Sequence, residues 1–347
     1  MENTKAILKV PGTMEIRPAE VPVPRDDEVL LKVEYVGICG SDIHGFESGP
    51  FIPPKDPNQE IGLGHECAGT VVGIGSKVTK FKIGDKVCIE PGVPCGKCRF
   101  CLEGKYNICP DVDFMATQPN YRGALTNYLC HPESFTFKLP DNMDALAGAL
   151  VEPAAVGMHA ALLAGVTPGK KIVILGAGCI GLMTLQACRC MGATDIVVVD
   201  IIPKRLEMAK KLGAMAVVNS IEEDMVTAAK KLVGELGADI VFETAGAQVT
   251  AKQTPEMVVR GGKIMIVGTI PGETPINFLK INREVSIQTV FRYANCYQLT
   301  IDAISSGRFD VKSMVTDSYD YQEVQRAFEE SLSRKQDIIK GVIKISE

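Results

Sequence analysis

Residues 170–200 have the sequence KKIVILGAGCIGLMTLQACRCMGATDIVVVD, in which an apolar run, a glycine-rich turn, a helix-compatible stretch and a second apolar run follow one another. The glycines stand directly after the first apolar run and open the helical stretch, which is the context that gives the G-x-G-x-x-G pattern its meaning. Such a turn lets a pyrophosphate approach the backbone at a helix N-terminus, whose amides attract anions. The stretch therefore predicts a dinucleotide site.

The alternation of strand and helix continues on the C-terminal side of this stretch. Helices are expected at 203–212, 222–236 and 251–259, and the apolar runs AVVN, DIVFET and KIMIVGT follow these in turn. Strands that alternate with helices form a parallel sheet with crossover helices. We therefore expect a doubly wound α/β domain.

Residues 5–150 have a different texture. Short alternating or apolar runs, such as EVLLKVEYVG and GTVVGIGSKV, are broken by Gly, Pro and Asp, which is typical of an irregular, mostly β domain. Helical stretches at 297–305 and 322–333 and the strand-like IIKGVIKI could return to this first domain.

The composition sets bounds on partners and compartment. A chain of 347 residues with 46% hydrophobic residues suits about two domains, and its net charge of −5 gives no broad attraction to nucleic acid or anionic membranes. It has no apolar run of the roughly 20 residues that a membrane helix needs and no signal-peptide pattern. We expect a cytoplasmic protein, where clustered cysteines hold metal more often than they form disulfides.

Asp200 bears on the choice of cofactor. A carboxylate at the end of the second strand can accept hydrogen bonds from both hydroxyls of the adenosine ribose and would repel a 2′-phosphate, which favours NAD over NADP. Arg205 lies close by in sequence and could instead accept a phosphate. The alternative is a glycine turn in some other α/β protein, with Asp200 merely solvated.

Four cysteines lie within one short segment: Cys95, Cys98, Cys101 and Cys109. Their spacing suits a tetrahedral zinc with every position filled by sulfur, and a closed site of this kind is structural. Metal binding would supply folding free energy to a loop that otherwise lacks a core. The alternative is a set of free cysteines or a redox pair.

A second candidate metal set is dispersed along the chain. Cys39 lies in GICGSDIH, His65 and Glu66 lie in GLGHECAG, and Glu152 lies in LVEPAAVGMHA. Thiolate, imidazole and carboxylate together can hold zinc while one position stays open, which is typical of catalytic zinc. On these residues alone, His65 could equally be a core histidine and Glu66 an exposed charge.

Several motifs together resemble those of the zinc-containing medium-chain dehydrogenases over essentially the full length, and within them those of the sorbitol (polyol) dehydrogenases. They occur in the family's order: GICGSDIH, GHECAGTVVGIGSKV, KIGDKV, the four-cysteine loop, LVEPAAVGMHA, GAGCIG and VFRYAN. The resemblance implies a GroES-like, mostly β catalytic domain formed by residues 1–152 and 291–347. A Rossmann NAD-binding domain, residues 153–290, is expected between them.

The resemblance also implies roles for single residues. Cys39 and His65 would bind the catalytic zinc with Glu66 as third ligand, and Glu152 would either exchange with Glu66 or bond the zinc-bound water. Ser41 and His44 would relay the proton of the substrate hydroxyl toward solvent. The substrate contacts implied are Phe114, Thr117, Glu152, Arg292 and Tyr293. The cofactor contacts implied are Gly176, Gly178, Ile180, Gly181, Asp200, Arg205, Val267, Val290 and Arg292.

Two departures bear on the substrate. Some animal sorbitol dehydrogenases lack the four-cysteine loop that this chain has, and an aromatic pair in their first motif is replaced here by Gly45 and Phe46. The resemblance implies a homotetramer that oxidises a secondary hydroxyl of a polyol to a ketone, with zinc and NAD. The alternatives are a threonine, butanediol or secondary-alcohol dehydrogenase and, in another class, a zinc-ribbon interaction protein that senses NAD. The preferred polyol, the third zinc ligand and the choice between dimer and tetramer stay open.

Overall fold

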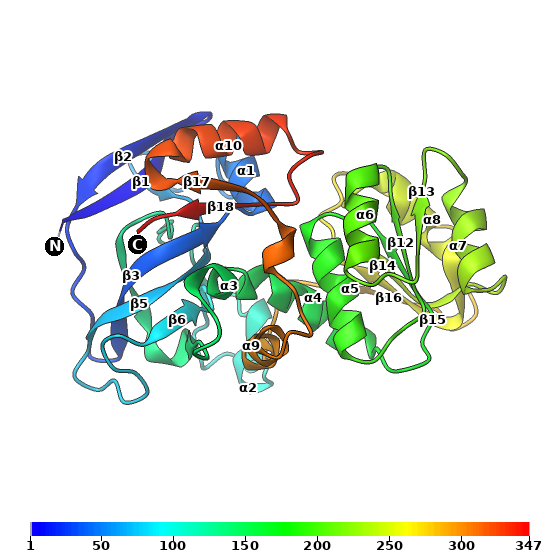
Figure 1. Ribbon diagram of the computed structural model, residues 1–347, viewed down its shortest axis with the longest axis horizontal. Helices are drawn as coiled ribbons and strands as arrows, with labels where there is room; N and C mark the ends of the chain where they lie inside the picture. Colours follow the sequence, from blue (N-terminus) through cyan, green and yellow to red (C-terminus); the bar gives the residue numbers. More distant parts are fainter. Residues whose placement is uncertain (1, 347) are drawn as a thin grey trace. The chain divides into compact units, whose positions relative to one another are not determined.

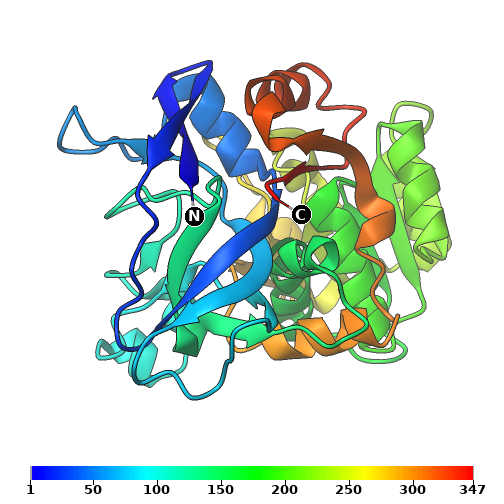
Figure 2. The same ribbon diagram turned by 60° about the vertical axis from the view of Figure 1, so that its left-hand side comes forward.

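The computed structural model of the protein describes residues 2–346 and forms two compact units. Each unit collects segments from separate parts of the chain. The first unit comprises Met1–Glu152, Tyr297–Ser305 and Val311–Glu347, and the second comprises Pro153–Cys296 and Ser306–Asp310. The strands nearest the two chain ends, β1 and β18, both lie in the first unit (Figures 1 and 2).

The chain returns to the first unit at Tyr297, later than the predicted return at residue 291. Residues 291–296 stay with the second unit, where the Cys296 thiol donates to the Ala155 carbonyl at 3.5 Å. The segment Ser306–Asp310 also belongs to the second unit, where the Asp310 N–H donates to Gln186 Oε1 at 2.6 Å. Residues 1 and 347, which the predicted catalytic domain includes, lie outside the described residues.

The first unit is built on a seven-stranded sheet with the order β10-β6-β5-β3-β18-β17, and β9 also pairs with β3. Its neighbours are antiparallel except for the parallel pair β17 and β18. Residues of β3 that point into the core are fully buried valines and leucine, which explains why this strand is central. The strands are β3 (Glu28–Gly37), β5 (Glu66–Ile74), β6 (Lys86–Ile89), β9 (Tyr128–Pro132), β10 (Thr136–Lys138), β17 (Val315–Asp320) and β18 (Lys340–Lys344).

Smaller elements complete the first unit. Phe46 and Phe328, from α1 and α10, place their rings 5.3 Å apart in its core. The remaining strands are β1 (Asn3–Val10), β2 (Thr13–Ala19), β4 (Ile61–Gly62), β7 (Gly92–Val93) and β8 (Asp113–Phe114). The helices are α1 (Gly40–Ser48), α2 (Arg99–Leu102), α3 (Ala145–Ala149), α9 (Tyr297–Ser305) and α10 (Val324–Ser333). The 3₁₀ turns are η1 (Tyr106–Ile108), η2 (Glu133–Phe135), η4 (Lys312–Met314) and η5 (Tyr321–Glu323). Helix α4 (Val151–Ala164) starts in the first unit and continues into the second.

The second unit confirms the predicted doubly wound parallel sheet. Six parallel strands have the spatial order β13-β12-β11-β14-β15-β16. The chain builds the sheet outward from β11 in one direction and then, from β14 on, in the other, so the switch point lies between β11 and β14. Helices α5 and α6 cover one face, and α7 and α8 cover the other (Figure 1). The strands are β11 (Ile172–Leu175), β12 (Ile196–Asp200), β13 (Ala216–Asn219), β14 (Ala238–Glu243), β15 (Val258–Ile266) and β16 (Ser286–Thr289). The helices are α5 (Cys179–Cys190), α6 (Pro203–Lys211), α7 (Met225–Val233) and α8 (Gln248–Met257), with the 3₁₀ turn η3 (Phe278–Lys280).

The structure contains helix α1, which was not predicted for residues 5–150. It begins directly after β3 because the Asp42 carboxylate accepts the Cys39 N–H at 3.0 Å, a cap that satisfies one of the free amides of the first turn. None of the helices within residues 2–346 combines the length and apolar character that crossing a membrane requires.

Candidate zinc and nucleotide sites

The end of β3 and the start of β5 bring three predicted zinc ligands together. Gly37 pairs with Glu66 across these antiparallel strands, so Cys39, just past β3, meets His65, just before β5. One ligand atom each of Cys39, His65 and Glu66 lies within 4.8 Å of the others. The buried Glu152, in the first turn of α4, does not belong to this group.

Asp42 lies behind His65. Its Oδ1 is 3.5 Å from His65 Nδ1 and accepts the Gly64 N–H at 2.8 Å. Burial acts to raise the pKa of Asp42, but the charge of His65 and the backbone donors outweigh it and lower that pKa. Because Nδ1 faces Asp42, Nε2 is the ring nitrogen left for a metal.

The protonation of His65 matters for metal binding. Burial opposes a charge on this imidazole, yet the Asp42 carboxylate raises the pKa of His65 well above its usual value. A metal ion at His65 therefore has to displace a proton.

The donor set fits zinc. Thiolate, imidazole and carboxylate are ligands that zinc accepts in sites with an open position. Glu66 is 1% exposed, and its Oε2 meets no donor of normal hydrogen-bond geometry within residues 2–346, although it forms a close ion pair with Lys340. A buried carboxylate oxygen of this kind is suited to a cation.

Of the other predicted residues of the first unit, Phe114 lies against His65. The Phe114 ring is buried 5.5 Å from the His65 ring, and Thr117 Oγ1 donates to the Phe114 carbonyl at 3.0 Å. Ser41 and His44 are three residues apart on α1 and so share a face of that helix. The His44 ring stacks on the ring of Phe51 at 3.8 Å.

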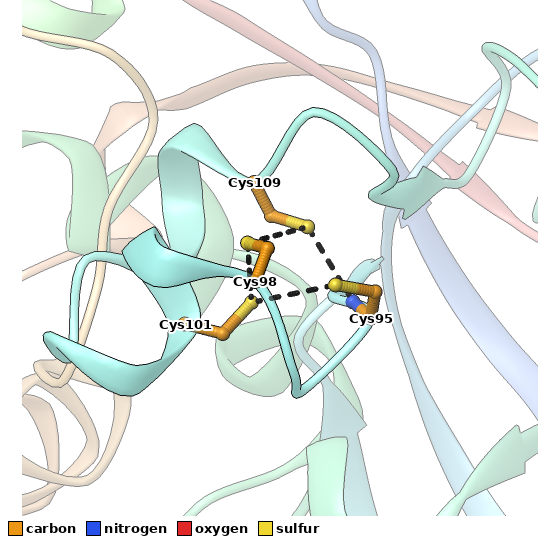
Figure 3. A group of neighbouring side chains, drawn as sticks. All are labelled: Cys95, Cys98, Cys101 and Cys109. Atoms are coloured by element: carbon orange, nitrogen blue, oxygen red, sulfur yellow. Dashed lines mark hydrogen bonds between the residues drawn. The ribbon is translucent and has the colours of Figure 1, made fainter.

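The four cysteines of the predicted structural site converge (Figure 3). Cys98 Sγ lies 3.4 Å from Cys101 Sγ and 3.8 Å from Cys109 Sγ, and Cys95 Sγ lies 4.0 Å from Cys101 Sγ. A tetrahedron with zinc–sulfur bonds of about 2.3 Å has edges of about 3.8 Å, so these separations fit zinc. All twelve cysteines are free thiols.

Electrostatics of the cysteine loop also favour a cation. Backbone N–H groups of Lys97 and Cys98 lower the pKa of Cys95 to about 7, whereas burial and the neighbouring sulfurs raise the pKa of Cys101 to about 12. Four thiolates so close together require a positive ion between them. Neither α2 nor η1 buries a residue, and so this loop has little apolar core of its own.

The glycine-rich turn of the second unit joins β11 to α5. Gly176 has a φ of 102°, which side chains rarely allow, and a Cβ on Gly181 would overlap the Gly176 carbonyl. Gly178 caps α5, and the nearest atom to a Cβ placed there is Arg205 Nη1 at 3.9 Å. The open space before this helix N-terminus fits a pyrophosphate.

The Asp200 carboxylate holds the backbone around this turn. Oδ2 accepts the Ala177 N–H at 2.6 Å, and Oδ1 accepts the Ile201 and Ile202 N–H groups at 2.7 and 2.8 Å. A carboxylate has about four acceptor positions, so one remains for a ribose hydroxyl.

The remaining predicted cofactor residues of this unit follow strand ends at the same edge of the sheet. Val267 follows β15, and Val290 and Arg292 follow β16, while Ile180 lies in the first turn of α5. Arg292 has a φ of 52° and lies 4.7 Å over the Phe291 ring, and Tyr293 is buried. Carboxyl ends of parallel strands are where nucleotide-fold proteins bind ligands.

Two family models match the chain. The Alcohol dehydrogenase GroES-like domain matches residues 25–141, and the Zinc-binding dehydrogenase domain matches residues 179–306. The chain belongs to the zinc-binding dehydrogenases. This confirms the predicted family, with a GroES-like and a Rossmann domain.

Full-length relatives of this dehydrogenase narrow the branch. An uncharacterised zinc-type alcohol dehydrogenase-like protein, YdjJ of Escherichia coli, is 76% identical over the whole of both chains. Sorbitol dehydrogenase of Bacillus subtilis is 42% identical, covering 99% of this chain and 97% of its own. A solved oxidoreductase of unknown specificity from Escherichia coli has a TM-score of 0.99 at 76% identity, with both chains fully covered. The dehydrogenase lies in the sorbitol branch of the zinc-containing medium-chain family.

Three buried charged residues near the predicted zinc site of the dehydrogenase were not anticipated: Asp42, Glu90 and Lys340. Asp42 had a sequence signal, since it stands three residues after Cys39 at capping-box spacing. Burial raises the pKa of Glu90 to about 7, and the charge of Glu152 adds to this rise. A hydrogen bond from Tyr106 of the cysteine loop acts in the other direction and lowers the pKa. No local pattern marks Glu90 or Lys340.

One cavity of the first unit lies away from the predicted zinc ligands. It has a volume of about 530 Å³ and is lined by β1, by the 120–132 segment and by neighbouring loops, without Cys39, His65, Glu66 or Glu152. Its cations Lys5, Arg25 and Arg122 are already paired with carboxylates, so the cavity has no evident charge preference.

Proposed function

We propose that this dehydrogenase oxidises a secondary hydroxyl of a polyol to the ketone, with NAD as hydride acceptor and zinc held by Cys39, His65 and Glu66. The observation that carries the proposal is the convergence of a thiol, an imidazole and a carboxylate in a chain of the sorbitol branch. Zinc at this site supplies a Lewis acid, and NAD supplies the hydride chemistry. Glu152 either takes turns with Glu66 or bonds the water at the site.

The residues of this chain orient groups and move the proton. Asp42 fixes the ring of His65 through Nδ1, and Phe114 shields that imidazole from water. The Ser41 hydroxyl accepts the substrate proton while it donates its own proton to the imidazole of His44 on the same helix face. The stacked ring of Phe51 limits the orientations of His44.

The same proposal places the other ligands. Cys95, Cys98, Cys101 and Cys109 hold a second, structural zinc. In the second unit NAD contacts the turn Gly176, Gly178, Ile180 and Gly181, with Asp200, Arg205, Val267, Val290 and Arg292 around it. Arg292 and Tyr293, with Phe114 and Thr117, contact the hydroxyls of the substrate.

The test is NADH production by the zinc-replete protein given NAD and single substrates. The panel contains sorbitol, xylitol, ribitol, 2,3-butanediol, threonine and isopropanol, each with and without a chelator. Turnover of polyols that disappears on chelation supports the proposal and ranks the substrates. Activity restricted to threonine or a simple alcohol would discard the polyol assignment, and silence on the whole panel would favour a protein that binds NAD without catalysis.

Replacing Asp200 with serine is expected to shift the cofactor preference toward NADP. The variant loses the carboxylate that accepts from the ribose and from three backbone amides, and hydrogen bonds to a charged group are worth roughly 10-fold to 100-fold in affinity. KM for NAD should rise by about that factor. Asp195→Ser, at the opposite end of β12, is the matched control, and an unchanged NAD-to-NADP ratio in Asp200→Ser would disprove the ribose assignment.

We also propose that the protein is a homotetramer in which the edge strand β16 pairs with its copy. All four residues of β16 are exposed, and Phe278, Leu279 and Phe291 nearby expose 73%, 80% and 51% of their surface. An unpaired edge with exposed apolar side chains favours pairing with a second chain.

An Ile287→Lys variant tests this assembly. A charge within β16 should disfavour pairing, so light scattering after gel filtration should show a smaller species than for the wild type. Leu236→Lys changes an exposed apolar residue of the same unit outside β16 and should leave the mass unchanged. Equal masses for the wild type and Ile287→Lys would rule out β16 as the contact.

A further inference from the structure

A buried lysine lies beneath the predicted catalytic zinc site. Lys340, the first residue of β18, is 3% exposed, and its ammonium forms an ion pair with Glu66 Oε2. The same Nζ donates to the Ile38 carbonyl at 3.0 Å. Ile38 immediately precedes Cys39, so one ammonium contacts the backbone before one predicted zinc ligand and the carboxylate of another.

The surrounding backbone leaves room for this ion pair. Gly37 pairs with Glu66 of β5 on one side and with Val342 of β18 on the other. A Cβ at Gly37 would overlap Glu66 Oε2 and would lie 3.1 Å from Lys340 Cε. The space in which the two charges meet therefore exists only because residue 37 has no side chain.

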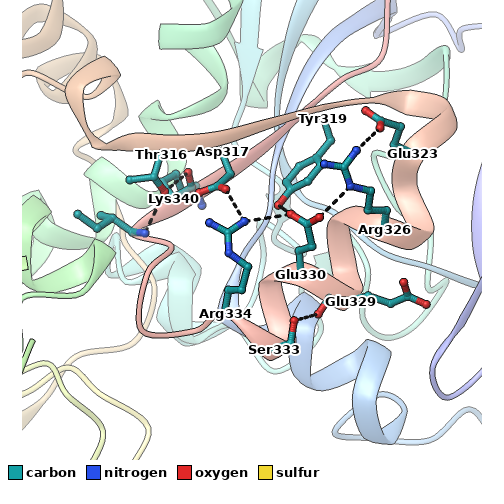
Figure 4. Close-up of polar contacts among 11 residues, drawn as sticks. Thr316, Asp317, Tyr319, Glu323, Arg326, Glu329, Glu330, Ser333, Arg334 and Lys340 are labelled. Carbon is teal, nitrogen blue, oxygen red and sulfur yellow. Dashed lines mark hydrogen bonds and ion pairs between the residues drawn. The ribbon is translucent and has the colours of Figure 1, made fainter. Parts of the chain in front are cut away.

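The C-terminal segment keeps Lys340 in place. Thr316 Oγ1 of β17 donates to the Lys340 carbonyl at 3.4 Å and accepts the N–H of Ile339 at 3.1 Å. Nearby, Arg334 pairs with Asp317 at 3.0 Å (Figure 4). The backbone on both sides of Lys340 is thus tied to β17.

The charges of the site explain why a cation is needed there. Cys39 as thiolate, Glu66 and the Asp42 carboxylate behind His65 give three negative groups, whereas zinc contributes two positive charges. A buried carboxylate or ammonium is costly without a partner, and Lys340 and Glu66 satisfy each other. The same contact occupies Glu66 Oε2 and so competes with any cation for that oxygen.

We propose that Lys340 is a positioning residue of the zinc site, which restrains Glu66 and weakens its bond to zinc so that Glu66 can leave the metal. The inference rests on the proposed zinc site, but not on the substrate. Without the ammonium, Glu66 loses its ion-pair partner among residues 2–346, and zinc would be the cation left to neutralise it. Removal of Lys340 should therefore tighten zinc binding, whereas a lysine that merely supports the fold would loosen zinc when removed.

The test follows release of zinc from the full-length protein to a chromogenic chelator. In Lys340→Met the catalytic zinc should leave about tenfold more slowly than in the wild type, and the four-cysteine zinc should leave at the wild-type rate. Lys340→Arg, which keeps the cation, should restore the wild-type rate. Lys344→Met, on the same strand, is the matched control. Cobalt in place of the catalytic zinc should show a changed visible spectrum in Lys340→Met only.

Two further variants separate an effect on zinc release from an effect on folding. Should Lys340→Met not fold, Lys340→Gln removes the charge but retains a donor, with circular dichroism as the check on folding. Glu66→Gln combined with the Lys340 variant should abolish the slow release. Unchanged or faster release of the catalytic zinc overturns the proposal. A protein that binds two zinc ions but oxidises no polyol would refute the proposed substrate alone, whereas one that binds only the four-cysteine zinc would refute both.

Discussion

A Cys39→Ser variant is expected to lose one of two zinc ions and to lower turnover by roughly 10³-fold or more. The thiol lies within 4.8 Å of the His65 and Glu66 ligand atoms, so its removal leaves a neutral oxygen in place of the softest donor. A Lewis acid supplies several kcal/mol to such a reaction, and each 1.36 kcal/mol is a factor of ten in rate. Zinc content by atomic spectroscopy and NADH production measure the two effects.

Cys67→Ser is the matched control for this variant. Cys67 lies in the same strand pair, two residues from His65, but burial raises the pKa of its thiol to about 12 and it is outside the cluster. It should retain two zinc ions and most of the turnover. Wild-type turnover in Cys39→Ser would remove Cys39 from the proposed site.

A Cys98→Ala variant is expected to lose the other zinc ion and much of the stability of the first unit. Cys98 has the shortest sulfur–sulfur separations in the cluster, at 3.4 and 3.8 Å, and neither α2 nor η1 buries a residue that could replace the metal. Structural zinc contributes directly to folding free energy, so a loss of several kcal/mol should lower Tm by on the order of 10 °C.

Calorimetry and limited proteolysis check this expectation. The loop around Cys98 should become the first site of cleavage, and turnover at low temperature should fall much less than in Cys39→Ser. Cys130→Ala, which removes a half-buried thiol of β9 outside the cluster, should melt within a few degrees of the wild type. An unchanged Tm and unchanged cleavage in Cys98→Ala would argue against a structural zinc.

The parts of the fold that the sequence predicted are those with local signals. The apolar run before Gly176 and the run that ends at Asp200 specify two neighbouring parallel strands, because period, length and glycine punctuation are all read within some thirty residues. The cysteine loop was equally local. Helix α1 was missed because its local signal, the capping-box spacing by which the Asp42 carboxylate accepts the Cys39 N–H, lies inside a segment of strand-like texture.

The parts that escaped prediction depend on contacts between distant segments. Lys340 looks like any lysine of a C-terminal strand until β18 pairs with β3 and brings it to Glu66. Glu90 follows the short strand β6, and its raised pKa results from burial and from Glu152 of α4, which only the folded chain brings about. The return at residue 297 rather than 291 was missed for the same reason, since Cys296 is held by Ala155.

The position of β18 in the chain has a consequence for biosynthesis. This strand pairs with β3 at Gly37, beside Cys39, yet the ribosome makes it long after the segment that carries Cys39, His65 and Glu66. In the nascent chain this edge of β3 is open, while nearly all of the intervening nucleotide-binding unit has already emerged and can fold. We expect the zinc of the Cys39, His65 and Glu66 site to be acquired late, after β18 has docked, whereas the cysteine loop, contiguous in sequence, can take up its zinc early in translation.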